Sequence, residues 1–509
     1  MTLRRFVLYP FLFCLYPVLF LWSKNLESVP FSFVIPPLIV SFVLTAIFFL
    51  IFSRIFKDYI KSGVILFILL VFFFSYGHVY NILQGVTIGG IEIYRHRYLV
   101  IIWPLLALLL SSICLASPKQ VLSALNAFLN IACLILIISP LMGILSFEFN
   151  NITQKNDPVL LANSRTTETI NNSDPAGNNS LPDIYYIILD AYGQADILKD
   201  EIGYNNSQFL DSLKARRFYV AEKSRSNYAW TMLSIPSALN MRYLNKDNIS
   251  FGLNDPEVIR ILRGKGYKII SLPSSGFYSV NINSDDEYIE RRPCCFLPDL
   301  IETTWLYPLE SLGAVNFIFN AKRQGILYQF ETLGSIPRMK GAKFIYAHIF
   351  ITHPPYVFND DGSPLILSLP ELFKPKNRSS NFWHNLEGII YAKQLIFANK
   401  KIIELVDKII LESRIPPIII IQGDHGPLLG YPPKPVTDFL LRQRMGILNA
   451  YYLPSKGKKY LYNNISPVNT FRLVFNTSFD MKYDLLPDIS YYSTGEEGTS
   501  DFIRVPDEE

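Results

Sequence analysis

The sequence predicts two parts, a transmembrane domain of five helices (1–149) and an α/β domain (182–492) with a mostly parallel sheet covered by helices on both faces. Apolar residues are concentrated in runs at the amino end, and after residue 182 short β-rich runs alternate with helical stretches. Hydrophobic residues make up 50% and aromatic residues 14% of the 509 positions. This composition is too apolar for an ordinary cytosolic enzyme.

The apolar runs each approach the roughly 20 residues that a helix needs to cross about 30 Å of hydrocarbon. They cover residues 6–22, 31–53, 63–83, 98–116 and 121–147. The first run follows Arg4-Arg5 and is similar to a cleaved signal, but four more runs follow and no small-residue cleavage site is evident. We therefore expect it to remain as an anchor.

The basic residues beside these spans predict their orientation. One side carries Arg4, Arg5, Arg54, Lys57, Lys61 and Lys119, whereas the other carries Lys24, Arg95 and Arg97. Because cytoplasmic loops are enriched in Lys and Arg, the amino terminus is expected in the cytoplasm. An odd number of spans then predicts a multi-pass protein of the inner (cytoplasmic) membrane with a periplasmic or otherwise extracytoplasmic α/β domain.

Composition divides the rest of the chain. Residues 150–181 are rich in Asn, Ser and Thr and cannot bury enough apolar surface to order themselves, so they form a linker. The expected strands are 184–189, 268–272, 343–350 and 418–421, and the expected helices are 206–216, 231–240, 256–263 and 386–411. Residues 493–509 are expected to be a loose acidic tail.

Charge and cysteine content exclude two classes of protein. The net charge is only +4, and no basic cluster is interleaved with aromatic residues, so nucleic acid is not expected as a partner. Three of the five cysteines lie in apolar runs, and the other two are the adjacent pair Cys294-Cys295. This spacing gives neither a disulfide scaffold nor a Cys/His zinc framework. The adjacent pair is either two packed thiols or a strained vicinal bridge.

Two of the expected strands end in a carboxylate. Ile418–Ile421 leads into a glycine-bracketed pair, Asp424-His425, and the strand 184–189 leads directly into Asp190. Ligands bind at the carboxyl ends of strands in α/β sheets, and a carboxylate beside an imidazole suits zinc or manganese. A buried Asp190 without a partner would cost several kcal/mol, and a cation is the simplest compensation. The alternative is that each Asp merely caps the segment that follows it.

One hydroxyl and two imidazole side chains are further candidates for the site. Thr231 opens the expected helix 231–240, where unsatisfied backbone N–H groups lower the cost of an alkoxide and bind anionic oxygens. The alternative is an N-cap threonine. His348 lies inside a strand and is either a satisfied core histidine or a functional one. His353 precedes Pro354-Pro355, which fixes the backbone, so we expect a substrate-binding or acid role.

In this order, Asp190, Thr231 in Thr-x-x-Ser-x-Pro, His353 in His-Pro-Pro and Asp424-His425-Gly426 resemble the alkaline phosphatase and sulfatase superfamily. The chain looks most like its membrane-anchored branch, which includes the phosphoethanolamine transferases and the lipoteichoic acid synthases. Those enzymes are similar in layout too, with five amino-terminal spans and an extracytoplasmic catalytic domain of the alkaline-phosphatase-like fold.

The resemblance implies a zinc or manganese ion held by Asp190, Thr231, Asp424 and His425. It also implies that Thr231 is the nucleophile that becomes phosphorylated. Attack on a phosphodiester headgroup would release a lipid alcohol, and His353, together with His348, would bind the phosphoryl oxygens or protonate the leaving oxygen.

The sequence departs from the pattern in three places. The branch often has Glu where this chain has Asp190, and phosphoethanolamine transferases commonly have a further histidine after Asp-His-Gly that is missing here, which puts a two-metal site in doubt. The segment 234–238 keeps the frame of the sulfatase formylglycine motif but lacks its arginine, so formylglycine chemistry is disfavoured. Ser234 is the second-choice nucleophile.

The predicted function is an enzyme of the cell envelope that transfers a phospho-substituent of the phosphoethanolamine or phosphoglycerol type. The donor is a phospholipid, and the acceptor is an envelope glycan or lipid. One alternative is a sulfatase-like or phosphodiesterase hydrolase that uses water as acceptor. Another is a non-catalytic membrane protein that uses the same fold as a binding module.

Overall fold

The structure is a computed structural model of the whole chain. It describes residues 6–26, 29, 31–83, 86–88, 91–92, 96–155, 181–244, 256–272, 280, 282, 285, 296–308, 317–365, 380–429, 437–454, 457–493 and 502–506. Most of the expected linker, the pair Cys294-Cys295 and the last residues of the expected tail lie outside these ranges. The chain forms two compact units, and each is treated by itself below.

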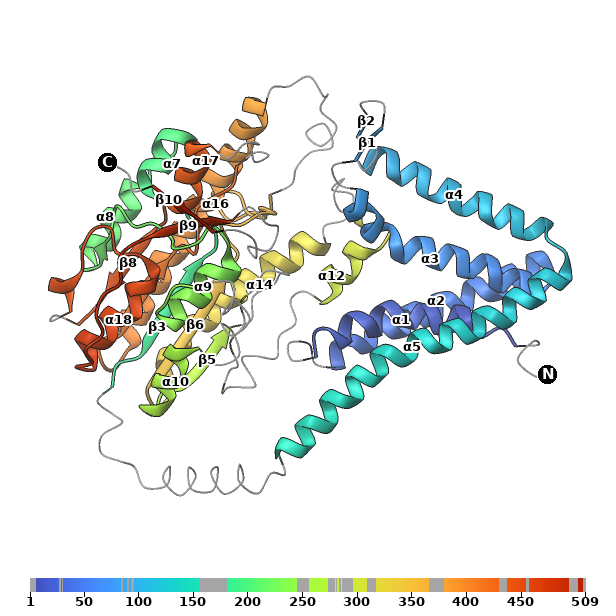
Figure 1. Cartoon of the computed structure of the whole chain (residues 1–509), viewed down its shortest axis with the longest axis horizontal. Coiled ribbons are helices and arrows are strands. Elements are labelled where there is room, and N and C mark those ends of the chain that lie inside the picture. The colour runs from blue at the N-terminus through green and yellow to red at the C-terminus, as the bar shows by residue number, and fades with distance from the viewer. Residues whose placement is uncertain are drawn as a thin grey trace. The chain divides into compact units, whose positions relative to one another are not determined.

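The first unit is built on the amino-terminal helices (Figure 1). They are α1 (Tyr9–Ser23), α2 (Phe31–Phe56), α3 (Tyr59–Leu83), α4 (His96–Ala116) and α5 (Lys119–Lys155), with a short hairpin of β1 (Thr87–Ile88) and β2 (Ile91–Glu92) before α4. Four of them, α2 to α5, contain stretches long and apolar enough to cross a membrane. The first expected span forms α1, an apolar helix of 15 residues, so a fifth span remains a prediction.

A segment from the middle of the chain belongs to this first unit. Helix α12 (Phe296–Thr303) buries Phe296 and Leu300 in the same apolar cluster as Val18 and Trp22 of α1. Two residues beyond α12, the backbone N–H of Trp305 donates to the carbonyl of Phe73 at 2.8 Å. Residues 296–305 lie within the range expected for the α/β domain, so the compact units do not follow that expected boundary.

The second unit contains a six-stranded sheet in the order β4-β8-β7-β3-β6-β5 (Figure 1). The strands are β3 (Ile184–Leu189), β4 (Tyr219–Val220), β5 (Lys268–Leu272), β6 (Lys343–Ile349), β7 (Ile418–Gln422) and β8 (Asn449–Tyr452). The four strands β7, β3, β6 and β5 are parallel, and β8 pairs antiparallel with β7 on one side and with β4 on the other. The mostly parallel sheet of the prediction is therefore present.

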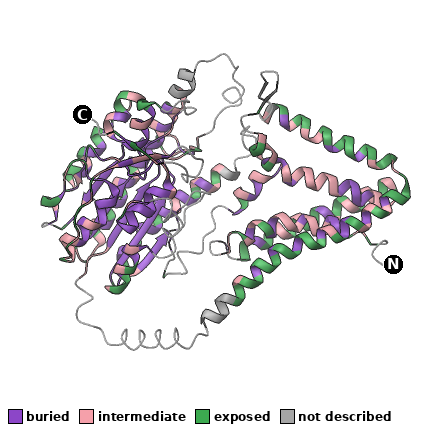
Figure 2. Cartoon of the chain, in the orientation of Figure 1, coloured by how far each residue is buried: buried purple, intermediate pink, exposed green. Residues whose placement is uncertain are grey.

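The helices of this unit are α7 (Ala195–Ile202), α8 (Ser207–Ala215), α9 (Thr231–Asn240), α10 (Glu257–Gly264), α14 (Phe317–Leu333) from Lys322 onward, α16 (Ser380–Glu412), α17 (Asp438–Met445) and α18 (Pro467–Ser478). Side chains of α9, α10 and α18 pack with Ile184, Tyr186 and Ile188 in one apolar core. Alternate residues of a strand face opposite sides of the sheet, and Tyr185 and Ile187 are also fully buried, so both faces of β3 are covered (Figure 2).

The expected loose tail is ordered in part. Strand β10 (Phe502–Val505) pairs antiparallel with β9 (Ser490–Ser493), and Val505 is buried against Ala229 and Met445. Three of the four residues in this strand are apolar, which the acidic composition of the tail as a whole conceals.

The strand order brings the candidate residues to one edge. The parallel register places Ile188 of β3 opposite His348 of β6 and Gln422 of β7. Asp190 and Asp424 each lie two residues beyond that level on adjacent parallel strands, so both emerge at the carboxyl edge of the sheet.

Candidate active site

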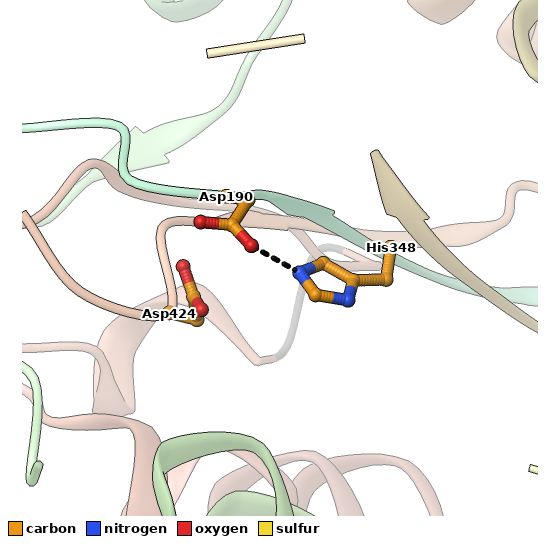
Figure 3. A group of neighbouring side chains, drawn as sticks. All are labelled: Asp190, His348 and Asp424. Atoms are coloured by element: carbon orange, nitrogen blue, oxygen red, sulfur yellow. Dashed lines mark hydrogen bonds and ion pairs between the residues drawn. The ribbon is translucent and has the colours of Figure 1, made fainter. Parts of the chain in front are cut away.

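Three buried side chains form a group that can hold a metal ion. Asp190, His348 and Asp424 offer ligand atoms that all lie within 4.8 Å of one another (Figure 3). His348 Nε2 is 3.0 Å from Asp190 Oδ2, and all three residues are at most 2% exposed. Carboxylate and imidazole donors of this kind are common zinc ligands.

The turn after β3 aims the backbone at Asp424. Ala191 has φ of 61°, a left-handed conformation that alanine rarely adopts, and its N–H donates to Asp424 Oδ1 at 3.0 Å. Tyr391 of α16 holds the same turn, because its hydroxyl donates to Ala191 O at 2.7 Å and accepts from Gly193 N at 3.1 Å. These bonds offset the strain and fix the spacing between Asp190 and Asp424.

The turn after β7 depends on two glycines. A Cβ atom at Gly426 would lie 2.0 Å from Gln443 O, and one at Gly423 would lie 2.6 Å from Tyr192 O. Only residues without a side chain therefore allow the Asp424-His425 turn to pack this closely against its neighbours.

Thr231 is the first residue of α9, and its hydroxyl points to the Asp424-His425 pair. Thr231 Oγ1 donates to Asp424 Oδ2 at 2.7 Å and lies 3.1 Å from His425 Nε2. The N-cap position is held by Trp230, without a side-chain capping bond. The hydroxyl is thus engaged with the two residues expected to be its metal-binding partners, at a helix end whose positive field favours an anionic oxygen.

His425 is neutral at pH 7. Burial, followed by the charge of Arg444, lowers the pKa of His425 from 6.5 to about 4. His425 Nδ1 lies 3.0 Å from Gly426 O, a group that only accepts, so Nδ1 carries the ring proton. The lone pair of Nε2 therefore faces Thr231 Oγ1, where it can bind a metal ion or accept a proton.

Asp190 is a carboxylate with an unused oxygen. Burial raises its pKa, but the interactions with His353, His348 and His425, among them the hydrogen bond to His348, outweigh burial and lower the pKa below the ordinary 3.8. Oδ2 is bonded to His348, whereas buried Oδ1 has no hydrogen-bond partner among the described residues. His425 Nε2 lies 3.8 Å from that oxygen and 3.4 Å from Asp424 Oδ2. The orphaned oxygen and these neighbouring donors fit a divalent ion.

His353 lies on the loop after β6 and is partly exposed. Its Nδ1 is 2.6 Å from Pro354 O, and Lys322 Nζ donates to His353 O at 2.7 Å and to Pro355 O at 2.9 Å. Burial lowers the pKa of His353, so its ring is neutral at pH 7. His353 is the one expected site residue that is not fully buried, so we expect it to be the one that a substrate reaches first.

Ser234, the second-choice nucleophile, has a different environment. Its hydroxyl donates to the backbone carbonyl of Asp424 at 2.6 Å and lies 3.0 Å from Ser226 Oγ. Ser226 Oγ bonds the same carbonyl at 2.5 Å. Both serines thus hold the Asp424-His425 turn through its backbone. Ser226 was not predicted from the sequence, because an isolated serine in a loop belongs to no pattern.

Comparison with known proteins gives structural neighbours only. No family model and no curated protein matches the chain. The integral membrane lipooligosaccharide phosphoethanolamine transferase A (EptA) of Neisseria meningitidis is similar at 13% identity and a TM-score of 0.41, covering 94% of this chain and 95% of its own. The periplasmic domain of EptC from Escherichia coli is similar at 14% identity and a TM-score of 0.38, covering 60% of this chain and 84% of its own.

A protein assigned as a sulfatase, yidJ of Bacteroides fragilis, is similar at 11% identity and a TM-score of 0.39, covering 62% of this chain and 82% of its own. Because these scores are low, the functional argument below depends on the residues of this chain alone. By their names, two of these three structures are phosphoethanolamine transferases and the third is assigned as a sulfatase.

Proposed function

We propose that the protein is a membrane-anchored, metal-dependent enzyme that transfers a phospho-substituent from a phospholipid to a glycan or lipid of the cell envelope through Thr231. The observation that carries the proposal is the position of Thr231 Oγ1, 2.7 Å from Asp424 Oδ2 and 3.1 Å from His425 Nε2 at the start of α9. Thr231 follows the N-cap residue Trp230, so its hydroxyl is not needed to cap the helix and is directed instead at a buried carboxylate and a neutral imidazole.

Four residues would hold the ion: Asp190 through Oδ1, Asp424, His425 through Nε2, and Thr231. Zinc or manganese suits these donors, and such an ion would stabilise the Thr231 alkoxide and the charge on the phosphoryl oxygens. His348 has two arrangements open to it, because its Nε2 can bind the same ion or donate to Asp190 Oδ2. In either arrangement it fixes the orientation of Asp190.

In the first chemical step, Thr231 Oγ would attack the phosphorus of a phosphodiester headgroup. The bond from phosphorus to the lipid oxygen breaks, the lipid oxygen leaves as an alcohol with the proton that the Thr231 hydroxyl gave up, and the headgroup phosphate stays on Thr231. In the second step an acceptor hydroxyl attacks the same phosphorus, and the Thr231 oxygen leaves. His353 is assigned to the protons of the leaving and entering oxygens, and its neutral ring suits removal of a proton from the acceptor.

The apolar amino-terminal helices support the choice of a phospholipid as the donor. The four long apolar helices would anchor the protein in a membrane. A donor lipid confined to the same bilayer is then present at a high effective concentration. The orientation expected from the basic residues puts the site on the outer side of the inner membrane, where envelope glycans and lipids are available as acceptors.

The test is covalent labelling of the purified, zinc-loaded full chain with phosphatidylethanolamine that carries radioactive phosphate. Label should appear on Thr231 and should be absent from the Thr231→Val variant. Label that appears and then passes to water without any added glycan or lipid would assign the protein as a hydrolase instead. Zinc-loaded wild type that takes up no label from phosphatidylethanolamine or phosphatidylglycerol would refute the transferase assignment.

A further inference from the structure

Arg444 is a buried cation for which the proposed reaction has no role. It lies near the end of α17, is 5% exposed, and directs its hydrogen bonds to carbonyl oxygens. Nη1 donates to Gly426 O at 2.7 Å, and Nη2 donates to Ala229 O. Gly426 closes the Asp424-His425 turn, and Ala229 stands two residues before Thr231. One guanidinium group therefore joins the segment that carries the nucleophile to the segment that carries its partners.

The position is an expensive one for a positive charge. Burial lowers the pKa of Arg444 from 12.5 to about 10, which still leaves it charged at neutral pH. It also lies near the amino-terminal, positive end of α9, where a cation is disfavoured. The ring of Trp230 at 5.5 Å gives a cation–π contact, and the charges of Asp424 and Asp190 favour the charged form. A neutral donor could bond the same two carbonyls without the cost of burying a charge, so these hydrogen bonds alone do not explain an arginine here.

We propose that Arg444 is a positioning residue for the transfer reaction, which holds Thr231 in line with Asp424 and His425 and adds a fixed positive charge beside them. The proposal rests on the function proposed above. Two carboxylates and a phosphodiester anion carry one more negative charge than a single divalent ion balances. Arg444 supplies the missing charge from within the fold, without occupying space in the site.

Arg472 of α18 provides a matched control, because it contacts the carboxyl end of α9 in the way that Arg444 contacts the amino end. Arg472 donates from Nε to Met241 O at 2.9 Å and from Nη1 to Asp484 O at 2.7 Å, and it lies 5.7 Å from the ring of Tyr483. It thus repeats the pair of carbonyl contacts and the aromatic contact of Arg444 at the carboxyl end of α9. Arg472→Gln removes an equivalent structural tie without touching the site.

The experiment compares Arg444→Gln, Arg444→Lys and Arg472→Gln in the zinc-loaded full chain. Two quantities are measured: the rate at which Thr231 is labelled by phosphatidylethanolamine, as kcat and KM, and the affinity for inorganic phosphate by calorimetry. Arg444→Gln should lower kcat by about tenfold or more, because small misplacements of reacting groups are costly, and should raise KM, because the fixed charge beside the phosphodiester is lost. It should also weaken phosphate binding by about tenfold.

Arg444→Lys separates the two roles, because it keeps the charge and loses one of the two bonds. Its kcat should fall by about tenfold, while phosphate affinity stays within about threefold of wild type. Arg472→Gln should change neither quantity.

A folded Arg444→Gln that labels Thr231 and binds phosphate like wild type would overturn the proposal. If Arg444→Gln does not fold, Arg444→Lys with an unchanged kcat would overturn it equally. Wild type that binds phosphate but takes no label from lipid would refute the proposed function alone, since the phosphate affinities still test Arg444.

Discussion

Thr231 Oγ1 and Asp424 Oδ2 lie 2.7 Å apart, although 193 positions separate the two residues in the chain. Asp424 is also held by the N–H of Ala191 through its other oxygen, and its backbone carbonyl accepts from Ser234. Every acceptor of Asp424 is therefore tied to a segment of the site. This arrangement fixes where the Thr231 hydroxyl must lie, which is the requirement for a nucleophile that attacks in line.

Replacing the Thr231 hydroxyl tests that relationship directly. Thr231→Val keeps the shape of the side chain and should abolish labelling by phospholipid, because no oxygen remains to attack phosphorus. Thr231→Ser keeps the oxygen and should still be labelled. Ser234→Ala is the matched comparison on the same helix: it should still be labelled on Thr231, with a loss of about 1 kcal/mol of stability from the missing bond to Asp424 O. Label on Ser234 in the Thr231→Val variant would show that the nucleophile was assigned wrongly.

Asp190→Asn tests the metal site. Zinc that binds the folded chain at 100 times its Kd adds about 2.7 kcal/mol of stability, so the melting midpoint of a wild-type domain of this size should rise by about 4 °C over an EDTA-treated sample. Asp190→Asn removes the negative charge of the carboxylate, whose Oδ1 is the expected metal ligand, and should therefore lose most of the zinc-induced rise in the melting midpoint. Asp407→Asn removes an exposed carboxylate paired with Arg216 and should keep it. An equal rise in Asp190→Asn and wild type would remove Asp190 from the ligands.

The four parallel strands of the α/β domain were predictable because their burial is visible in their composition, whereas β4 and β8 were not predicted. Ile184–Leu189 and Ile418–Gln422 are almost wholly β-branched, aromatic or aliphatic, as expected for strands covered on both faces, and each is followed by a carboxylate. A carboxylate that follows such a run lies at the ligand-binding edge of the sheet, which is why Asp190 and Asp424 were candidates from the sequence. Their predicted ligand roles stay predictions until an ion is measured.

Other parts of the site depend on spatial order that the sequence does not encode locally. His348 meets Asp190 because β6 lies beside β3, and no pattern within either strand states that pairing. Arg444 lies in a short helix with two arginines in its last turn, which by composition predicts a solvent-exposed end. Its burial follows from the approach of Ala229 and Gly426, two segments about two hundred positions apart.

His425 predicts a dependence of stability on pH. Its pKa is about 4 in the folded chain and 6.5 without the fold, so between these values the unfolded chain binds a proton that the folded chain does not. Stability should therefore fall as the pH is lowered from 6.5 to 4, by an amount on the order of 3 kcal/mol for the metal-free protein. The check is the melting midpoint of the EDTA-treated full chain across this range, compared with His425→Gln, whose profile should be flatter.

Asp190 affects the pH dependence of stability in a separate, lower pH range. Its pKa is lowered by folding, so its contribution is present above the ordinary value of 3.8 and is lost only as the pH falls further. A difference between wild type and His425→Gln that appears only below pH 4 would therefore be inconsistent with the assignment to His425. Parallel profiles between pH 4 and 6.5 would contradict it outright.

Gly426→Ala tests whether the Asp424-His425 turn needs the close approach that its glycine permits. The added Cβ would lie 2.0 Å from Gln443 O and 2.8 Å from Gly446 O, both backbone atoms that cannot turn aside. The turn must then shift, which should cost about 2 kcal/mol or more and move His425 away from Thr231, so that labelling falls by about 10²-fold. Gly264→Ala is the matched control: its Cβ meets nothing within 4 Å at the end of α10, and alanine there should be neutral or stabilise by up to about 1 kcal/mol. If Gly426→Ala has the same melting midpoint and the same rate of Thr231 labelling as Gly264→Ala, the turn tolerates the added Cβ. The close packing of the turn then does not position Thr231.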